Sequence, residues 1–153
     1  NLFALNNDEE TMKYISPPLN KAQVAGVINW FISEWERLGY GWFAVFEKET
    51  GEFIGQCGLQ CLEGKQDAAD VELAFVIAKN HWRQGYATEA ARAVLTFGIN
   101  NAGLRRIVAV TMEQNMPSQR VLDKLHFQFE ENRKLYDRTV KCYALQPASG
   151  SMP

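Results

Sequence analysis

Apolar residues follow a helical spacing at the start of the chain. Over residues 20–38 they recur about every three to four positions, which predicts an amphipathic helix that ends at Gly39. A shorter helix is predicted over residues 8–15, because the Ser-Pro-Pro run that follows it disfavours helical backbone. The chain is therefore predicted to open with helices.

Beyond Gly39 the pattern changes to short apolar runs separated by turn residues, which is typical of strands. The predicted strands cover residues 42–48, 53–62, 71–78, 105–112, 127–137 and 139–146. A turn at residues 49–52 joins the first pair, and the last pair forms a hairpin. The run VELAFVIA, at 71–78, is almost wholly apolar, which predicts a central strand.

Helical spacing returns between these strands. One helix begins just after Gly85 and places a stripe of small and apolar residues on one face: Ala87, Ala90, Ala91, Val94, Leu95 and Gly98. Another covers residues 115–125, with Pro117 near its first turn. The succession of strand, helix and strand over 71–112 requires a crossover and hence a parallel pair. The predicted fold class is therefore α/β (α+β), with a mixed sheet.

Composition limits the domain count and the function classes. The chain has 153 residues, of which 46% are hydrophobic, so we expect a single domain over residues 1–146 and a disordered tail at 147–153. The net charge of −2 indicates no footprint for nucleic acid and no polybasic patch for a membrane surface. We expect no membrane span and no signal peptide, because no apolar run is long enough and the first residues lack the character of a leader.

The cysteines are Cys57, Cys61 and Cys142, an odd number and too few for a disulfide framework. This usage favours a reducing, cytoplasmic environment. Cys57 and Cys61 share one strand-like run without metal-ligand spacing, so no metal site is predicted.

The segment HWRQGYATEA, at 81–90, places a glycine and a small residue where a helix begins. The first N–H groups of a helix have no partner within it, and the helix dipole adds partial positive charge there. Gly85 permits backbone conformations closed to other residues, Ala87 keeps the approach open, and Arg83 adds a positive charge. The segment has neither a dinucleotide fingerprint nor a P-loop, so it predicts a cradle for another phosphate or pyrophosphate ligand. A glycine near a helix start is also common without any ligand.

The same segment resembles motif A of the GNAT superfamily of acyl-CoA-dependent N-acetyltransferases, whose pattern is Gln/Arg-x-x-Gly-x-Gly/Ala. The match begins at Trp82, where Gln or Arg is usual, and ends at Ala87. A tryptophan followed by GYATEA is similar to the RimJ/RimL-like branch, which includes ribosomal-protein N-terminal acetyltransferases. VELAFVIA resembles the strand before motif A, and VTMEQNMPSQRVLDKLHF resembles the Asn-x-x-Ser…Leu-Gly-Phe segment that follows. Together these segments cover residues 70–127.

The resemblance implies a mostly antiparallel sheet with a central, splayed parallel pair, flanked by helices. Relative to this branch, we expect the first strand to be missing, either from the fold or because the sequence starts after it. Acetyl-CoA is the implied cofactor, with the main-chain amides of residues 83–88 around its pyrophosphate and the exposed edge of the splayed strand beside its pantetheine arm. The residues so assigned to the cofactor are Phe75, Val76, Ile77, Trp82, Arg83, Gln84, Gly85, Tyr86, Ala87, Thr88, Asn115 and Ser118. Asn115 and Ser118 are equally explained as helix caps.

The implied reaction is direct attack by a primary amine on the thioester of acetyl-CoA. An ammonium has no lone pair, so a carboxylate that accepts its proton is expected near the acceptor. Glu72 is the first candidate, because a charge in an otherwise apolar strand is costly without a partner or a purpose. An edge position or a buried salt bridge with an arginine would explain Glu72 equally well. Asp137 and Glu130 are weaker candidates.

The leaving thiolate also requires a proton donor. Several members of the superfamily use a tyrosine, but the matching position here is Leu122. Ser118 is the substitute donor if it faces the sulfur. His126 replaces the usual glycine of Leu-Gly-Phe and is interpreted as a tolerated surface residue.

The acceptor is expected to be a primary amine, either a protein N-terminus or a small molecule such as a polyamine, an aminoglycoside or an amino-acid-like metabolite. Trp30, Trp35, Trp42 and Tyr136 either line its site or belong to the core. Dimers are common in the superfamily, and a homodimer is one option. Two other function classes stay open: a non-catalytic acyl-CoA sensor and a nucleotide-binding regulator.

Overall fold

The computed structural model describes residues 1–146, and the predicted disordered tail at 147–153 lies outside them. The helices are α1 (Leu2–Asn6), α2 (Glu9–Met12), α3 (Lys21–Leu38), α4 (Tyr86–Asn100) and α5 (Met116–Lys124). The strands are β1 (Trp42–Phe46), β2 (Phe53–Cys61), β3 (Val71–Ile77), β4 (Ile107–Thr111), β5 (Gln128–Leu135) and β6 (Arg138–Leu145). Short 3-10 helices occur at η1 (Leu62–Gly64) and η2 (Lys79–His81).

The N-terminal segment differs from the prediction of one helix over residues 8–15. The helix there is only α2, whose start is fixed by the side chain of Asp8, which accepts a hydrogen bond of 2.7 Å from the Thr11 N–H. The preceding α1 was not predicted. It is held at its end by the amide side chains of Asn6 and Asn7, which donate back to main-chain oxygens one turn earlier. Such side-chain bonds leave no trace in the apolar periodicity.

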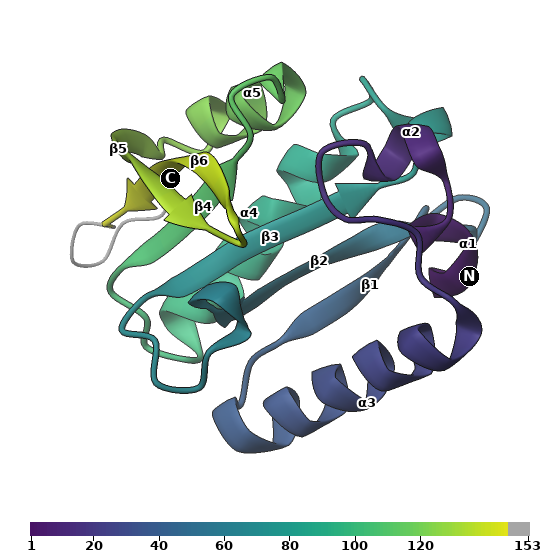
Figure 1. The fold of residues 1–153 in the computed structure, drawn as a ribbon, viewed down its shortest axis with the longest axis horizontal. Helices are drawn as coiled ribbons and strands as arrows, with labels where there is room; N and C mark the ends of the chain where they lie inside the picture. Colours follow the sequence, from purple (N-terminus) through teal and green to yellow (C-terminus); the bar gives the residue numbers. More distant parts are fainter. Residues whose placement is uncertain (147–153) are drawn as a thin grey trace.

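The strands form a six-stranded sheet in the order β1-β2-β3-β4-β6-β5. Only β3 and β4 run parallel within this sheet of the described residues, and every other neighbouring pair is antiparallel. In Figure 1, α4 lies behind the sheet, whereas α1 and α2 cross its front near the end of β3. The predicted mixed, mostly antiparallel sheet with a central parallel pair is confirmed.

The central pair separates soon after it begins. β3 and β4 are in register only at Val71 with Ile107 and at Glu72 with Val108. β2, by contrast, follows β3 as far as Ile77. The main chain of β3 beyond Glu72 therefore has a strand partner on one side only, which confirms the predicted splay.

The two faces of the sheet have separate cores. Leu73 and Ala109 belong to the core under α4 and α5, together with Leu95 and Leu122. Val108 belongs to a core on the opposite face, with Cys142 and Leu62 among its members. Because side chains alternate along a strand and neighbouring partners point the same way, Glu72 faces away from α4.

Close packing sets the direction of α4. Ala91 and Leu95 are fully buried, as the stripe of small residues predicts. A Cβ atom on Gly98 would lie 2.6 Å from Cδ1 of the buried Leu59, so a larger residue at this position would require the Leu59 side chain to shift. The N-terminus of α4 is thereby held beside the end of β3.

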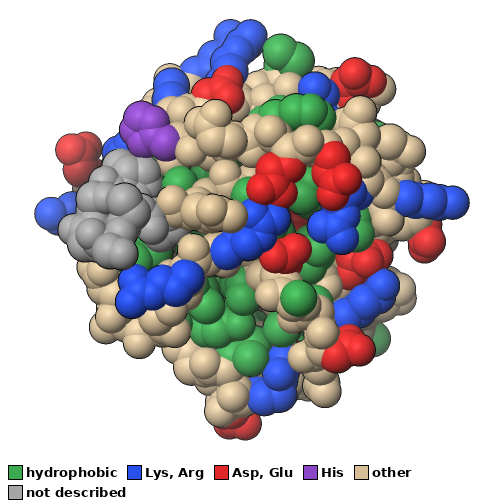
Figure 2. All heavy atoms as spheres, turned by 90° about the vertical axis from the view of Figure 1, so that its left-hand side faces the viewer, with side chains coloured by type: hydrophobic (Ala, Val, Ile, Leu, Met, Phe, Trp, Pro, Cys, Tyr) green, Lys and Arg blue, Asp and Glu red, His purple; other side chains and the backbone are tan. Residues whose placement is uncertain are grey.

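The surface carries charges of both signs. On the face that Figure 2 draws, basic and acidic side chains are interspersed around a smaller apolar area. No helix in the described part of the chain has the length and the apolar character that crossing a membrane requires.

Candidate active site

A cavity of about 210 Å³ lies where β3 and β4 separate. Its walls include Leu73 and Ala109, which face α4 and α5, and Glu72 and Val110, which belong to the opposite face. Residues of α5 and of the β5–β6 hairpin complete it. The cavity therefore reaches both faces of the sheet at the point where the strands split.

The N-terminus of α4 presents a row of free main-chain donors. Gly85 caps the helix with a φ of 85° and makes no side-chain hydrogen bond to it, and Arg83 has a φ of 61°. Within the described part of the chain, the main-chain N–H groups of residues 83–88 make no hydrogen bond. A Cβ atom on Gly85 would meet nothing within 4 Å, so the space beside it is open. These donors, with the positive end of the helix dipole, suit an anion such as a diphosphate.

Two aromatic side chains hold this loop in place. The indole Nε1–H of Trp82 donates to the main-chain oxygen of Ile77 at 2.6 Å, which ties the loop to the end of β3. The hydroxyl of Tyr86 donates to Oε1 of Glu47 at 2.5 Å, which ties α4 to the β1–β2 turn. Trp82 and Tyr86 were both predicted to belong to the cofactor site, and their side chains position the main chain of this loop.

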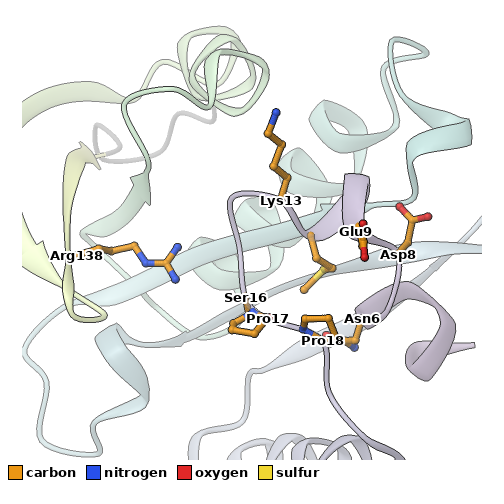
Figure 3. A pocket seen from close by; sticks show the side chains of 9 residues that line it. Asn6, Asp8, Glu9, Lys13, Ser16, Pro17, Pro18 and Arg138 are labelled. Atoms are coloured by element: carbon orange, nitrogen blue, oxygen red, sulfur yellow. The ribbon is translucent and has the colours of Figure 1, made fainter.

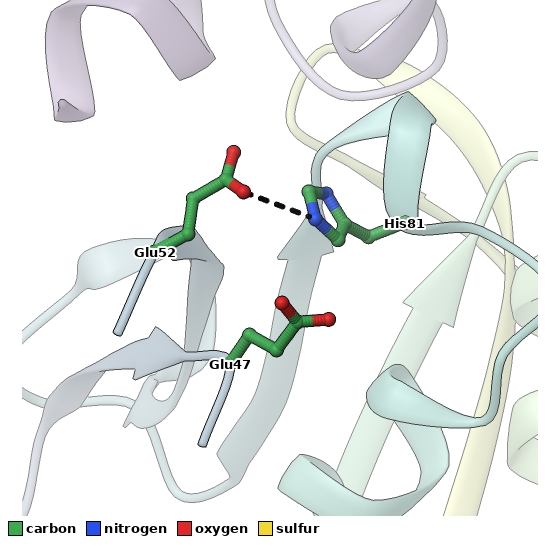
Figure 4. A group of neighbouring side chains, drawn as sticks. All are labelled: Glu47, Glu52 and His81. Carbon is green, nitrogen blue, oxygen red and sulfur yellow. Dashed lines mark ion pairs between the residues drawn. The ribbon is translucent and has the colours of Figure 1, made fainter. Parts of the chain in front are cut away.

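Glu47, Glu52 and His81 gather at the same turn (Figure 4), with one ligand atom of each within 4.8 Å of the others. Nε2 of His81 lies 3.7 Å from Oε2 of Glu52. An imidazole with two carboxylates is a donor set that could hold a divalent cation. Both oxygens of Glu47 already accept hydrogen bonds, from Thr50 and from Tyr86, and these bonds lower the pKa of its carboxyl. The cluster thus has protein partners of its own, and the predicted absence of a metal stays a prediction.

Glu72 is the centre of a hydrogen-bond network on the face away from α4. It is 4% exposed, and its Oε2 accepts bonds from Nε2 of Gln60, at 3.1 Å, and from the hydroxyl of Tyr136. The indole of Trp42 donates to Oε1 of Gln60 at 3.0 Å, which fixes the orientation of that amide. Burial raises the pKa of Glu72, while the bonds from Tyr136 and Gln60 oppose the rise. Among the described residues Glu72 has no ion-pair partner, so the buried salt bridge with an arginine does not explain it.

Tyr136 is the residue of this network that sequence reasoning did not place there. It occupies the β5–β6 turn with a φ of 53°, a conformation that L residues adopt rarely. Glu63 holds it: the Glu63 N–H donates to the phenol oxygen at 3.0 Å, and the Tyr136 N–H donates to the Glu63 carboxylate at 3.1 Å. Burial, and then the charge of Glu72, raise the pKa of Tyr136, so the phenol stays a hydrogen-bond donor.

The start of α5 forms the wall beyond β4. Asn115 caps this helix, its Oδ1 accepting a bond of 3.3 Å from the Ser118 N–H, so the capping interpretation holds for Asn115. Both residues also line the cavity, as does the fully buried Leu122, which has no proton to give. Thr111, also in the wall, was not predicted; its hydroxyl is buried without a hydrogen-bond partner among the described residues.

The weaker carboxylate candidates lie elsewhere. Glu130 forms a two-fold hydrogen-bonded pair with Arg106 on the outside of the sheet, at 2.8 Å for each bond. Asp137 is exposed in the hairpin turn and is not part of the cavity wall. Glu72 is therefore the carboxylate that the structure brings to the cavity.

The aromatic candidates divide between site and core. Trp42 and Tyr136 line the cavity, joined there by Tyr14. Trp35 instead packs on Phe43 and Phe97 in the core, as the core interpretation predicts. Trp30 packs against Phe31 of its own helix.

A second cavity, of about 390 Å³, adjoins the first on the front of the sheet. Residues of α1, α2 and the segment that follows form most of its wall, together with Arg138 at the start of β6 (Figure 3). Arg138 lines both cavities. The two cavities therefore meet at the side chain of Arg138.

A protein-family model described as an acetyltransferase (GNAT) domain matches residues 1–128. The chain belongs to the GNAT acetyltransferase family. It is 32% identical over 142 residues to the uncharacterized protein YkkB of Bacillus subtilis (strain 168), covering 91% of this chain and 80% of that protein. It is 31% identical over 135 residues to the uncharacterized N-acetyltransferase p20 of Bacillus licheniformis, covering 86% of this chain and 74% of that protein.

The fold is shared with solved structures at lower identity. A spermidine N-acetyltransferase from Vibrio cholerae, in complex with CoA and spermine, superposes with a TM-score of 0.76 at 17% identity, covering 95% of this chain and 87% of that one. The predicted enzyme class is confirmed: the protein is a GNAT-family N-acetyltransferase. Enzymes of this family use acetyl-CoA and acetylate amines.

Proposed function

We propose that this protein transfers an acetyl group from acetyl-CoA to a primary amine that approaches Glu72 from the front of the sheet. The observation that carries the proposal is a cavity that reaches both faces of the sheet and is lined by the buried carboxylate of Glu72 and by Phe75 and Val76 of β3. The free main-chain donors of residues 83–88 follow β3 along the chain. The acyl donor would enter on the side of α4, and the acceptor on the side of α1 and α2.

The residues present suit CoA. The free N–H groups of residues 83–88 match a diphosphate. The edge of β3 over Phe75, Val76 and Ile77 has no strand partner on the β4 side, and its main-chain groups on that side, apart from the Ile77 oxygen that Trp82 holds, are offered to the amides of pantetheine. The unpartnered hydroxyl of Thr111 and the side chain of Ser118 lie in the wall near the far end of this route. A buried hydroxyl without a partner is costly, which supports a ligand atom beside it.

Acetyl-CoA supplies the thioester carbonyl that the amine attacks. An ammonium acceptor first gives a proton to Glu72, whose Oε1 accepts no hydrogen bond from the described residues. The new N–C bond forms as the C–S bond breaks, and the thiolate leaves with its electron pair. The acylated nitrogen then loses its second proton, which replaces the proton that the thiolate takes up. Ser118 is the proposed donor of a proton to that thiolate, because its helix turn borders the cavity.

The branch within the family and the acceptor belong to the same proposal. The RimJ/RimL-like segment around Trp82 makes a protein N-terminus one acceptor class, and the Vibrio cholerae relative makes polyamines another. A peptide and amine library, assayed for release of free CoA thiol, separates these classes.

The decisive variant is Glu72→Gln, which keeps the shape of the side chain and removes the base. We expect it to bind CoA as the wild type does and to lower kcat by about 10²–10⁴-fold. Glu130→Gln, which changes a carboxylate outside the cavity, is the matched control. A wild-type protein that binds CoA but acetylates nothing would favour the sensor interpretation. Greater stabilisation by ATP or NAD than by CoA would favour the nucleotide-binding regulator.

A further inference from the structure

Arg138 stands between the two cavities. It begins β6 directly after the turn that carries Tyr136, and its side chain forms part of both cavity walls. In Figure 3 its guanidinium reaches from the hairpin toward the segment that holds Ser16 and Pro17. It is thus the cation that an acceptor in the larger cavity would meet on its way to Glu72.

The charge of Arg138 is not balanced within the described part of the chain. Its one hydrogen bond there runs from Nη1 to the main-chain oxygen of Tyr14, at 3.4 Å, and no carboxylate lies within ion-pair distance. By contrast, Arg106 pairs with Asp70 and Glu130. A half-buried guanidinium without a counter-charge favours an anion beside it.

The other charged groups of the larger cavity do not supply that anion. Lys13 is a second cation in the wall of this cavity, and Asp8 and Glu9 lie at the end opposite Arg138 in Figure 3. Oδ1 of Asp8 is also engaged in capping α2. Among residues 1–146, no carboxylate of this cavity therefore neutralises Arg138.

Resting on the proposed acetyl transfer, we propose that the acceptor is a small amine that also carries a carboxylate, which Arg138 binds while the amine reaches Glu72. The planar guanidinium matches a carboxylate in a two-fold hydrogen-bonded arrangement. The cavity walls thus carry a cation at Arg138 and a carboxylate at Glu72. They complement a molecule whose carboxylate faces Arg138 and whose amine faces Glu72. A polyamine would instead place a second ammonium beside the guanidinium, where like charges repel.

The test compares amines that differ only by the carboxylate: lysine with cadaverine, and phenylalanine with phenethylamine. We expect the wild type to have a kcat/KM at least about tenfold higher for the amino acid of each pair. Arg138→Met should remove this preference, mainly by raising KM for the amino acid of each pair. Arg138→Lys should keep part of it, because the charge remains without the planar fork. Arg133→Met on the same hairpin, outside both cavity walls, should keep all of it.

Equal kcat/KM values within each pair, or a preference that survives in Arg138→Met, would overturn the inference while the acetyl transfer itself stands. Absence of all turnover would count against the proposed function instead. In that case the thermal shift given by Nα-acetyl-lysine is compared with that given by N-acetylcadaverine in CoA-loaded protein. Larger stabilisation by the former, lost in Arg138→Met, supports the carboxylate site, and equal shifts overturn it.

Discussion

Glu72 is a carboxylate held where water hardly reaches it, yet it is not neutralised by a cation. Burial pushes its pKa up, and the hydrogen bonds from Tyr136 and Gln60 pull it down. A base needs a pKa high enough to take a proton and low enough to be ionised when the amine arrives. The residues around Glu72 therefore adjust its pKa in both directions, because burial raises it and the hydrogen bonds lower it.

The pH dependence of acetyl transfer should follow the ionisation of the Glu72 carboxyl. Because Glu72 must be ionised to accept a proton, kcat/KM of the wild type should rise with pH through a pKa above the ordinary value for glutamate. Glu72→Gln should lack this rise in a pH–rate profile. An unchanged acid limb in that variant would remove Glu72 as the base.

Tyr136→Phe should move the acid limb without abolishing activity. The phenol donates a hydrogen bond that stabilises the ionised form of Glu72, so its loss raises the pKa of Glu72 and shifts the limb to higher pH. Tyr143→Phe, a tyrosine of the core under α4 and α5, is the control and should leave the limb in place. A shift to lower pH in Tyr136→Phe would contradict the proposed network.

As the pH rises, the contribution of Glu72 to stability should fall while its contribution to activity rises. Since its folded-state pKa is raised, the stabilising contribution of Glu72 is present below its unfolded pKa and is lost as the pH rises through the folded pKa. Glu72→Gln is neutral throughout, so its Tm should exceed that of the wild type above that folded pKa by a few degrees. Melting curves across pH check this, and a difference that does not narrow toward acid pH would refute it.

Individual residues of the site were harder to predict from the sequence than the helices and strands. Glu72 stands out in the sequence because a lone charge interrupts an apolar strand. Tyr136 does not, since its contact with Glu72 depends on how the β5–β6 turn folds over the end of η1. Nothing local to a tyrosine in a hairpin turn reveals a partner so distant along the chain.

At the scale of elements, the start of α4 is the part on which cofactor binding depends. Its position follows from the small stripe that packs on the sheet and from the ties of Trp82 and Tyr86 to β3 and the β1–β2 turn. Gly85 has a left-handed backbone with open space beside it, and Gly51 in the β1–β2 turn has the same two properties. Comparing the same substitution at Gly85 and at Gly51 therefore distinguishes an effect of backbone strain from an effect on ligand binding.

Gly85→Ala and Gly51→Ala should each destabilise the protein by about 1 kcal/mol, because an alanine pays for left-handed backbone. Only Gly85→Ala should also weaken CoA binding, by about tenfold, because its methyl group projects into the space kept for the diphosphate. Isothermal titration calorimetry with CoA gives both affinities. Equal affinities in the two variants would remove the start of α4 as the anion site.

The elements were largely predictable because their signals are local. The strands from β1 to β6 and the helices α3, α4 and α5 lie within a few residues of the predicted ranges. The exception is the N-terminal segment, where α1 depends on side-chain bonds from Asn6 and Asn7 and not on an apolar stripe. The cradle was predicted from Gly85 for the same local reason.

At the scale of the whole molecule, the separation of β3 and β4 opens a cavity within the sheet. The crossover through α4 requires the two strands to be parallel, and the sequence reveals that requirement. Where they separate depends on long-range packing, which apolar periodicity does not show. Asn115 and Ser118 of the α5 wall were predicted only through the family resemblance. The proposed acetyl transfer requires the thioester and the amine to meet in this cavity.

A crystal structure of the protein with CoA tests that requirement most directly. The account predicts the diphosphate at the main-chain N–H groups of residues 83–88, the pantetheine arm along the free edge of β3, and the sulfur inside the cavity that Glu72 lines. A diphosphate bound away from Gly85, or an arm that never enters the split between β3 and β4, would contradict it.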